Sequence, residues 1–231
     1  MPARFEELDF QETSMGEVSL RRRHDLTVDA EVYEVKLGEE YLMSSLFTVA
    51  EVELARLGLA ACAGDDLEVV VGGLGLGYTA RAALADHRVR ELTVIEALAP
   101  VIDWHRRGLV PAASELTGDE RTQIAHGDFF AEFQAPTGRQ WDAILLDIDH
   151  SPQHVLHPDH AEFYSSAGLA RVAARLRPGG VFALWSNDPP EESFTKLLAG
   201  VFAEVEAHRV TFPNPLQDRE ALNTVYTAKR T

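Results

Sequence analysis

The segment VVVGGLGLGYTAR, Val69 to Arg81, carries three regularly spaced glycines: Gly73, Gly75 and Gly77. An apolar run precedes them and a helix-forming run follows, which predicts a strand, a tight turn and a helix. Glycines suit such a turn because a Cβ would block a close ligand or forbid the backbone angles. The arrangement brings a nucleotide against backbone N–H groups and the start of a helix. We therefore predict that the three glycines frame a cofactor that contains a nucleoside.

Two acidic residues further along the chain fit the rest of a nucleoside. Glu96 ends an apolar run about 20 residues after the glycines, where a carboxylate can accept hydrogen bonds from both ribose hydroxyls. Asp128, in HGDFF, could accept a hydrogen bond from the adenine amino group, with Phe129 against the ring. The alternatives are a solvated carboxylate for Glu96 and, for Asp128, the N-cap of a helix at 129–133.

The reacting end of the site is predicted at Asp147, the last residue of the strand-like run WDAILLD. Open parallel sheets bind ligands at the carboxyl ends of their strands. A carboxylate there can position an ammonium group and help to remove the proton that an amine must lose before it attacks. The alternative for Asp147 is a cap at the end of the strand. Asp149 is a candidate second contact to the same substrate.

Alternating strands and helices must position these residues. The alternation begins at residue 67 and predicts a parallel sheet covered by helices on both faces. Strands are expected at 67–72, 91–96, 141–147 and 180–186, with a further one ending in RTQIAHGD. Helices are expected at 78–86, 99–107, 160–176 and 191–202, and two last strands flank PNPLQD.

The residues before this alternation have a different pattern. Residues 17–43 hold two or three strand-like runs, EVSLRRR, AEVYEVKL and EEYLMSS. The segment 47–61 then has apolar residues at helical spacing, namely Val49, Val52, Leu54, Leu57 and Leu59. We therefore expect a small β-rich N-terminal region, 1–46, followed by a cofactor-binding α/β domain, 47–231.

Charge and composition exclude some classes of function. The 231 residues include 21 Lys and Arg and 37 Asp and Glu, a net charge of −16, which disfavours nucleic acid as a partner. The acidic surface would steer a cationic small molecule or simply keep the protein soluble. No apolar run is long enough to cross a bilayer, and the N-terminal residues do not resemble a signal peptide. With a single cysteine, Cys62, these features predict a cytoplasmic protein without a membrane partner.

The motifs VVVGGLGLG, VIE, HGD, WDAILLD and LRPGG occur in an order that resembles class I S-adenosylmethionine-dependent methyltransferases. A narrower resemblance, to spermidine synthase, covers most of the chain. It is carried by LMSSLFTVAEVELA, VGGLGLG, LLDIDHSP, EFYSSAGLARVAARLRPGGVF and TFPNP. It implies a Rossmann-like methyltransferase-type sheet after a small β-rich region, a homodimer as one option, and Asp147 as the residue that activates the amine.

The chain also departs from the spermidine synthase pattern. Leu76 replaces an aspartate that helps to hold the cofactor's tail, Trp185 replaces a glutamine, Asn187 a glutamate and Phe212 a tyrosine. Each change removes a polar group that would contact a diamine or the cofactor's amine, which lowers selectivity for such groups. Trp185 is a candidate substrate contact because its ring could hold a cation, as could that of Phe212, although core packing is the alternative for both.

A histidine-rich segment, HSPQHVLHPDH at 150–160, raises the question of a metal ion. Its spacing matches no standard zinc signature and two prolines interrupt it, so no metal is expected. NDPP at 187–190 is interpreted as a turn before a helix.

The sequence therefore predicts a transferase that uses S-adenosylmethionine or decarboxylated S-adenosylmethionine and acts on a small, cationic amine. The transferred group is methyl or aminopropyl. The alternatives are a small-molecule methyltransferase without a role in polyamine metabolism and a non-catalytic nucleoside-binding protein. A nicotinamide-dependent oxidoreductase is disfavoured because Tyr78 interrupts the dinucleotide glycine spacing.

Overall fold

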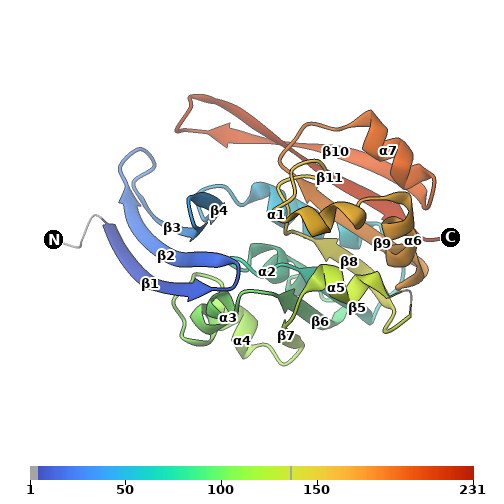
Figure 1. Ribbon diagram of the computed structural model, residues 1–231, viewed down its shortest axis with the longest axis horizontal. Coiled ribbons are helices and arrows are strands. Elements are labelled where there is room, and N and C mark those ends of the chain that lie inside the picture. Colours follow the sequence, from blue (N-terminus) through green and yellow to red (C-terminus); the bar gives the residue numbers. More distant parts are fainter. Residues whose placement is uncertain (1–4, 136) are drawn as a thin grey trace.

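The computed structural model describes residues 5–135 and 137–231, which form two β-sheets and their surrounding helices. A four-stranded antiparallel sheet lies at one end of the molecule, and a seven-stranded sheet flanked by helices makes up the rest (Figure 1). The predicted fold class, a Rossmann-like α/β domain preceded by a small β-rich region, is confirmed.

The small sheet is a meander in the order β1-β2-β3-β4. Its inner face inserts Val18, Leu20 and Val35 into the core of the larger domain. The strands are β1 (Phe5–Thr13), β2 (Gly16–Asp25), β3 (Ala30–Leu37) and β4 (Glu40–Ser44).

The first strand was not predicted, because none of its side chains is buried and its sequence shows no apolar alternation. Backbone pairing with β2 and ion pairs across the two strands hold β1 in place. The Arg22 guanidinium lies 2.6 Å from the Glu6 carboxylate across the β1–β2 pair. Arg23 bonds Asp25 and Glu34 in the same sheet, so the basic run at 21–23 forms ion pairs within the sheet.

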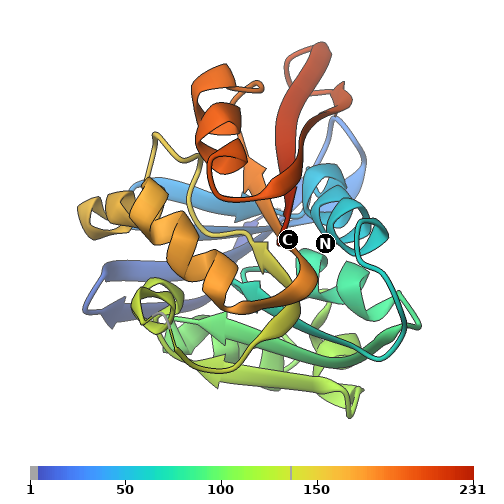
Figure 2. The same cartoon turned by 90° about the vertical axis from the view of Figure 1, so that its right-hand side faces the viewer.

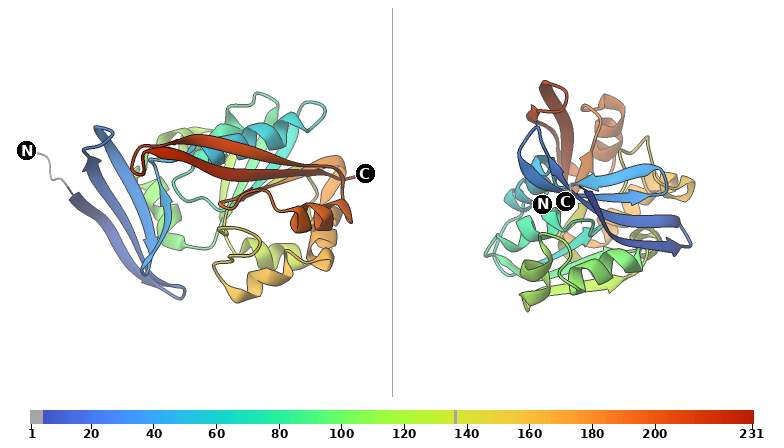
Figure 3. Two further views of the ribbon diagram at one scale, coloured as in Figure 1. Left: turned by 90° about the horizontal axis from the view of Figure 1, so that it is seen from above. Right: turned by 90° about the vertical axis from the view of Figure 1, so that its left-hand side faces the viewer.

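The large sheet has the order β10-β11-β9-β8-β5-β6-β7. The strands from β9 to β7 run parallel, whereas β11 is antiparallel to both of its neighbours. The β10–β11 hairpin extends beyond the helices toward the small sheet (Figure 3). The strands are β5 (Leu67–Gly72), β6 (Val89–Glu96), β7 (Thr122–His126), β8 (Trp141–Leu146), β9 (Leu176–Ser186), β10 (Ala203–Asn214) and β11 (Arg219–Lys229).

Helices cover the two faces of this sheet in separate groups (Figure 2). The side chains of α1 to α4 pack in one hydrophobic cluster, and those of α5 to α7 pack in another. The helices are α1 (Val49–Ala60), α2 (Tyr78–Leu84), α3 (Ala99–Arg106), α4 (Ala113–Gly118), α5 (Phe129–Gln134), α6 (Ser166–Ala174) and α7 (Glu192–Ala199).

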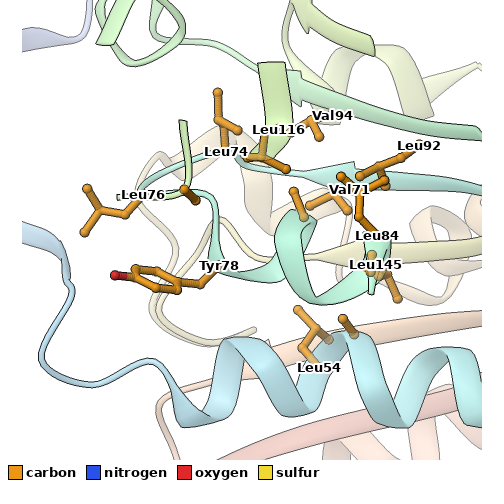
Figure 4. Packing of buried hydrophobic residues seen from close by; sticks show 14 of the residues in the cluster. Leu54, Val71, Leu74, Leu76, Tyr78, Leu84, Leu92, Val94, Leu116 and Leu145 are labelled. Carbon is orange, nitrogen blue, oxygen red and sulfur yellow. The ribbon is translucent and has the colours of Figure 1, made fainter. Parts of the chain in front are cut away.

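The central strands are buried on both faces, as their continuous apolar runs predict. On β5, Val71 joins the cluster of α1 to α4, while Val70 points to the opposite cluster. Figure 4 shows the first cluster, where Leu54 of α1 and Leu145 of β8 lie among its members.

Helix α1 buries Leu54 and Leu59 of the predicted apolar stripe together with small residues that the prediction did not include. Val49 is 44 % exposed, whereas Ala50, Ala55 and Gly58 are buried. A Cβ at Gly58 would lie only 2.7 Å from Leu145 Cδ2. The helix therefore packs closely on the sheet through its small residues, which a search for large apolar side chains overlooks.

The helix predicted at 160–176 is divided in two. A 3₁₀-helix, η1 (Pro158–Glu162), precedes α6, and the Ser165 hydroxyl caps α6 by accepting a hydrogen bond from the Gly168 N–H at 3.1 Å. This break allows the preceding loop to turn back over the carboxyl end of β8.

Candidate active site

A cavity of about 420 Å³ lies at the carboxyl ends of the parallel strands. The small sheet closes it from the other side with Ser14 and Met15 of the β1–β2 hairpin and Met43 of β4. Residues at the carboxyl ends of β5 to β9 supply the opposite wall, so both parts of the chain are needed to enclose it.

The order of the strands in the sheet places the predicted site residues one after another along this cavity. Asp128 follows β7, Glu96 ends β6, the glycine turn follows β5, and Asp147 follows β8. All four features line the cavity, and they do so in the order expected for adenine, ribose, the cofactor's centre and the reacting end.

The glycine turn adopts the left-handed backbone that the prediction required, with φ of +92°, +47° and +89° at Gly73, Gly75 and Gly77. At Gly73, a Cβ would lie 2.2 Å from the backbone oxygen of Asp147, so no side chain fits there. Gly73 and Gly75 line the cavity. Gly77 is the N-cap of α2 and is not among the residues that line the cavity; a Cβ there would lie 2.7 Å from Leu116 Cδ1, so close packing also requires glycine, and a cofactor contact at Gly77 stays a prediction.

Glu96 is buried and its carboxylate is fixed from two sides. Oε2 accepts a hydrogen bond from the Leu74 N–H at 2.9 Å, and Oε1 accepts one from the Leu98 N–H at 2.7 Å. Burial raises the pKa of this carboxyl, while the backbone donors oppose that shift. An oriented carboxylate therefore lines the cavity where the ribose is expected.

We expect Glu96→Ala to weaken the binding of 5′-methylthioadenosine by about 1–3 kcal/mol, because ribose hydroxyls would lose their acceptor. Calorimetric titration would measure the loss. The 2′-deoxy form of the ligand should bind wild type more weakly than the parent ligand, and the variant should no longer distinguish the two. Glu91→Ala, on the same strand but outside the lining of the cavity, is the control. Equal discrimination by the variant and wild type would remove Glu96 from the ribose site.

Asp128 is the N-cap of α5, the alternative that the sequence left open, and it also lines the cavity. Its Oδ1 caps α5 by accepting hydrogen bonds from the N–H groups of Phe130 and Ala131, and the residue also lines the cavity. Phe129 reaches the cavity wall but is 1 % exposed and stacks on Phe133 in the core. An adenine contact at Asp128 and Phe129 therefore remains a prediction, with Phe129 offering little free surface.

Asp147 is held at the reacting end by a hydroxyl from a neighbouring helix. Thr79 of α2 donates a hydrogen bond to Asp147 Oδ2 at 2.6 Å. Burial raises the pKa of Asp147 to about 6, and the Thr79 hydrogen bond partly offsets this rise. A carboxylate with such a pKa is largely ionised at neutral pH yet basic enough to take part in proton transfer.

A second carboxylate, Glu51, lies at this end of the cavity and was not identified from the sequence. It stands in the first turn of α1 and lines the cavity with Asp147. Burial and the negative charge of Asp147 raise the pKa of Glu51 to about 8. No spacing rule connects two residues so far apart in the chain. The one available signal was its place at the start of a helix within LMSSLFTVAEVELA, a segment that carried the resemblance.

Asp149 has a different role from the substrate contact that the sequence predicted. It is 1 % exposed and is not among the residues that line the cavity. Its carboxylate accepts hydrogen bonds from the Leu156 N–H at 2.7 Å, His160 Nδ1 at 2.9 Å and the Tyr164 hydroxyl at 2.8 Å. These partners leave Asp149 as the anchor of the loop 150–160, whose residues Leu156 and His160 face the cavity.

The residues that depart from the spermidine synthase pattern lie in different surroundings. Trp185, at the end of β9, lines the cavity, as a substrate contact would. Phe212 is buried and packs on Phe47 with ring centroids 5.9 Å apart, which assigns it to the core. Leu76 is fully buried beside Tyr78 and offers the cavity no polar group (Figure 4).

The histidine-rich loop uses its side chains for other contacts. His154 Nδ1 lies 3.0 Å from Asp188, and His160 stacks on Phe130 with ring centroids 3.8 Å apart. Across residues 5–135 and 137–231, no group of three or more His, Cys, Asp or Glu side chains is arranged to hold a metal ion. Nor does any helix in these ranges have the length and apolar character needed to span a membrane.

The wall of the cavity carries a one-sided set of charges. Among the described residues that line it are four carboxylates and three histidines but no lysine or arginine. The carboxylates are Glu51, Glu96, Asp128 and Asp147, and the histidines are His126, His150 and His160. Such a cavity favours a cationic ligand and, in its described lining, offers no lysine or arginine to a ligand carboxylate.

Comparison with known proteins relates this architecture to one group of enzymes. No family model matches the chain. A polyamine aminopropyltransferase of Prochlorococcus marinus is 30 % identical over 134 residues, which cover 56 % of this chain and 44 % of that protein. One from Bacillus mycoides is 28 % identical over 139 residues, covering 60 % and 46 %. The matches thus span less than half the length of each relative.

Solved spermidine synthase structures are similar to this chain over nearly its whole length. A spermidine synthase in complex with the transition-state analogue AdoDATO has a TM-score of 0.75 at 16 % identity, over 97 % of this chain and 74 % of that one. The spermidine synthase of Thermotoga maritima gives the same TM-score and identity, over 97 % and 73 %. The chain therefore has the spermidine synthase fold and homologues among polyamine aminopropyltransferases.

Proposed function

We propose that this spermidine synthase-like protein is an aminopropyltransferase that uses decarboxylated S-adenosylmethionine as donor and a small cationic amine as acceptor. The observation that carries the proposal is the set of charges on the cavity wall. Decarboxylated S-adenosylmethionine has a sulfonium and an ammonium but no carboxylate, which suits a wall with four carboxylates and no lysine or arginine.

The chain's own residues fit the parts of this donor in order. Gly73 and Gly75 leave room for its centre, Glu96 would accept from the ribose hydroxyls, and Asp128 would accept from the adenine amino group. When bound, the donor supplies an electrophilic carbon attached to a sulfonium, with a neutral thioether as leaving group. The alignment of its parts along the cavity would bring that carbon to the β8 side, where Asp147 lies.

Asp147 would orient the acceptor's ammonium and accept a proton from it, so that the neutral amine can attack. The new N–C bond forms as the C–S bond breaks, and the electron pair of that bond stays on sulfur. The products are 5′-methylthioadenosine, the elongated amine and one proton. Trp185 would contact the acceptor from β9.

Methyl transfer from S-adenosylmethionine is the less favoured alternative. That cofactor carries a carboxylate on its methionyl tail, and the described lining of the cavity offers it no lysine or arginine. The single, buried Cys62 is in keeping with action in a reducing cytoplasm.

Calorimetric titration with decarboxylated S-adenosylmethionine and with S-adenosylmethionine, followed by turnover assays with a series of diamines, tests the proposal. We expect tighter binding of the decarboxylated donor and release of 5′-methylthioadenosine that depends on an added amine. Tighter binding of S-adenosylmethionine would support a methyltransferase instead. Binding without turnover of any amine would support a nucleoside-binding protein.

A further inference from the structure

Two secondary-structure elements bring carboxylates to the same corner of the cavity. Glu51, in the first turn of α1, and Asp147, after β8, both line it. The Thr79 hydroxyl of α2 lies 2.6 Å from Asp147 Oδ2 and 3.4 Å from the backbone oxygen of Glu51, which joins the three elements. This corner lies on the β8 side of the glycine turn, away from Glu96 and Asp128 on the β6 and β7 side.

Among the described residues that line the cavity, no lysine or arginine balances the charges in this corner. Asp147 raises the pKa of Glu51 to about 8 together with burial, so the two side chains repel each other when both are ionised. Tyr78 of α2 is the other titratable neighbour, and its ring is covered by Arg81, whose guanidinium carbon lies 4.7 Å from the ring centroid. Arg81 does not line the cavity. An ammonium group from a ligand would supply the missing positive charge.

The glycine turn provides no side chain for this task. Leu76 is fully buried as part of the hydrophobic cluster, and its side chain lies beside Tyr78 on the side of the N-terminal segment (Figure 4). Glu96 and Asp128 are bound to backbone N–H groups at the nucleoside end. Among the lining carboxylates, Glu51 is therefore the one placed to act with Asp147 on the donor's tail.

We propose that Glu51 selects the donor: it holds the ammonium end of decarboxylated S-adenosylmethionine and rejects S-adenosylmethionine, whose tail adds a carboxylate. This inference rests on the proposed function. When Glu51 and Asp147 are both ionised, a state that a bound ammonium stabilises, a methionyl carboxylate would be a third negative group beside them, and like charges at a desolvated site repel strongly. The tail of decarboxylated S-adenosylmethionine lacks this carboxylate, so only its ammonium group faces Glu51 and Asp147.

The test is calorimetric titration of three ligands at about pH 9, above the pKa of Glu51. The ligands are decarboxylated S-adenosylmethionine, S-adenosylmethionine and 5′-methylthioadenosine, which lacks the tail. The proteins are wild type, Glu51→Gln and the matched control Glu53→Gln. Glu53 is on the same helix but pairs with Arg56 and does not line the cavity.

For Glu51→Gln we expect the preference for the decarboxylated donor over S-adenosylmethionine to fall about 10- to 100-fold, with 5′-methylthioadenosine binding unchanged. The control should keep the wild-type preference. Because ionisation of buried Glu51 at high pH costs stability, the melting temperature of Glu51→Gln should exceed that of wild type at about pH 9. The two proteins should melt together at about pH 4, where Glu51 is protonated and therefore neutral like the amide.

Two results would overturn the inference alone. One is an unchanged preference in Glu51→Gln, and the other is an equal loss of affinity for all three ligands, which would indicate a structural role. A wild-type preference for S-adenosylmethionine would overturn the proposed function itself, and the premise of the inference with it.

Discussion

Asp147→Asn is expected to lower turnover by at least about 100-fold, the range that loss of a positioned general base produces. An amide has nearly the shape of the carboxylate and can still accept the Thr79 hydrogen bond, but it cannot take a proton from the acceptor. Affinity for 5′-methylthioadenosine should therefore be unchanged. The measurements are steady-state release of 5′-methylthioadenosine and calorimetric titration of the same variant.

The pH dependence of the wild-type enzyme provides a second readout for Asp147. Because burial raises its pKa to about 6, the reactive carboxylate form is gained as pH rises through that value. We expect kcat/KM to rise over the same interval and this rise to be absent from the residual activity of Asp147→Asn. Asp103→Asn, a surface change on α3, is the control. Full activity in Asp147→Asn would show that this carboxylate does not activate the amine.

Asp149→Ala should have the largest effect on stability, a loss of about 3 kcal/mol or more in the free energy of unfolding. The substitution removes three hydrogen bonds to a buried carboxylate and leaves the Tyr164 hydroxyl without a partner in the core. Burial and the charge of Asp149 raise the pKa of Tyr164, so that its hydroxyl remains a donor. Urea unfolding of the ligand-free protein measures the loss.

A double-mutant cycle with Tyr164→Phe would isolate the central contact. The double variant should be more stable than the sum of the single losses predicts, because it no longer buries an unpaired hydroxyl. The alternative, taken from the sequence, was that Asp149 contacts the substrate. An unchanged stability together with a raised KM for the acceptor would restore that role and contradict the anchor.

Local sequence patterns were sufficient to predict the parallel strands and the site residues that directly follow them. Continuous apolar runs marked the parallel strands, and the glycine turn, Glu96 and Asp147 follow their ends directly. Because parallel strands present these ends at one edge, the three features were expected to meet, and they line one cavity.

What the sequence did not reveal depends on contacts between distant segments. Glu51 and Asp147 line the same cavity because α1 packs on the sheet, closely at Gly58, and no local pattern encodes that approach. Likewise, β1 is held by pairing and ion pairs rather than by an apolar face. Asp149 could not be distinguished from a substrate contact, since its three partners are later in the chain: Leu156 and His160 in the loop 150–160 and Tyr164 before α6.

The anchoring of the loop 150–160 has a consequence for how this fold can acquire new acceptors. Asp149 fixes the path of the loop by accepting hydrogen bonds from the backbone N–H of Leu156 and from the Tyr164 hydroxyl. The side chains of Leu156 and His150 face the cavity. Side chains that face the cavity can be exchanged without altering the backbone path of the loop, because other atoms fix that path. If the proposed function holds, acceptor choice is thus separable from folding in this segment, and a library varied at His150 and Leu156 alone is expected to retain the fold while its members are screened with new amines.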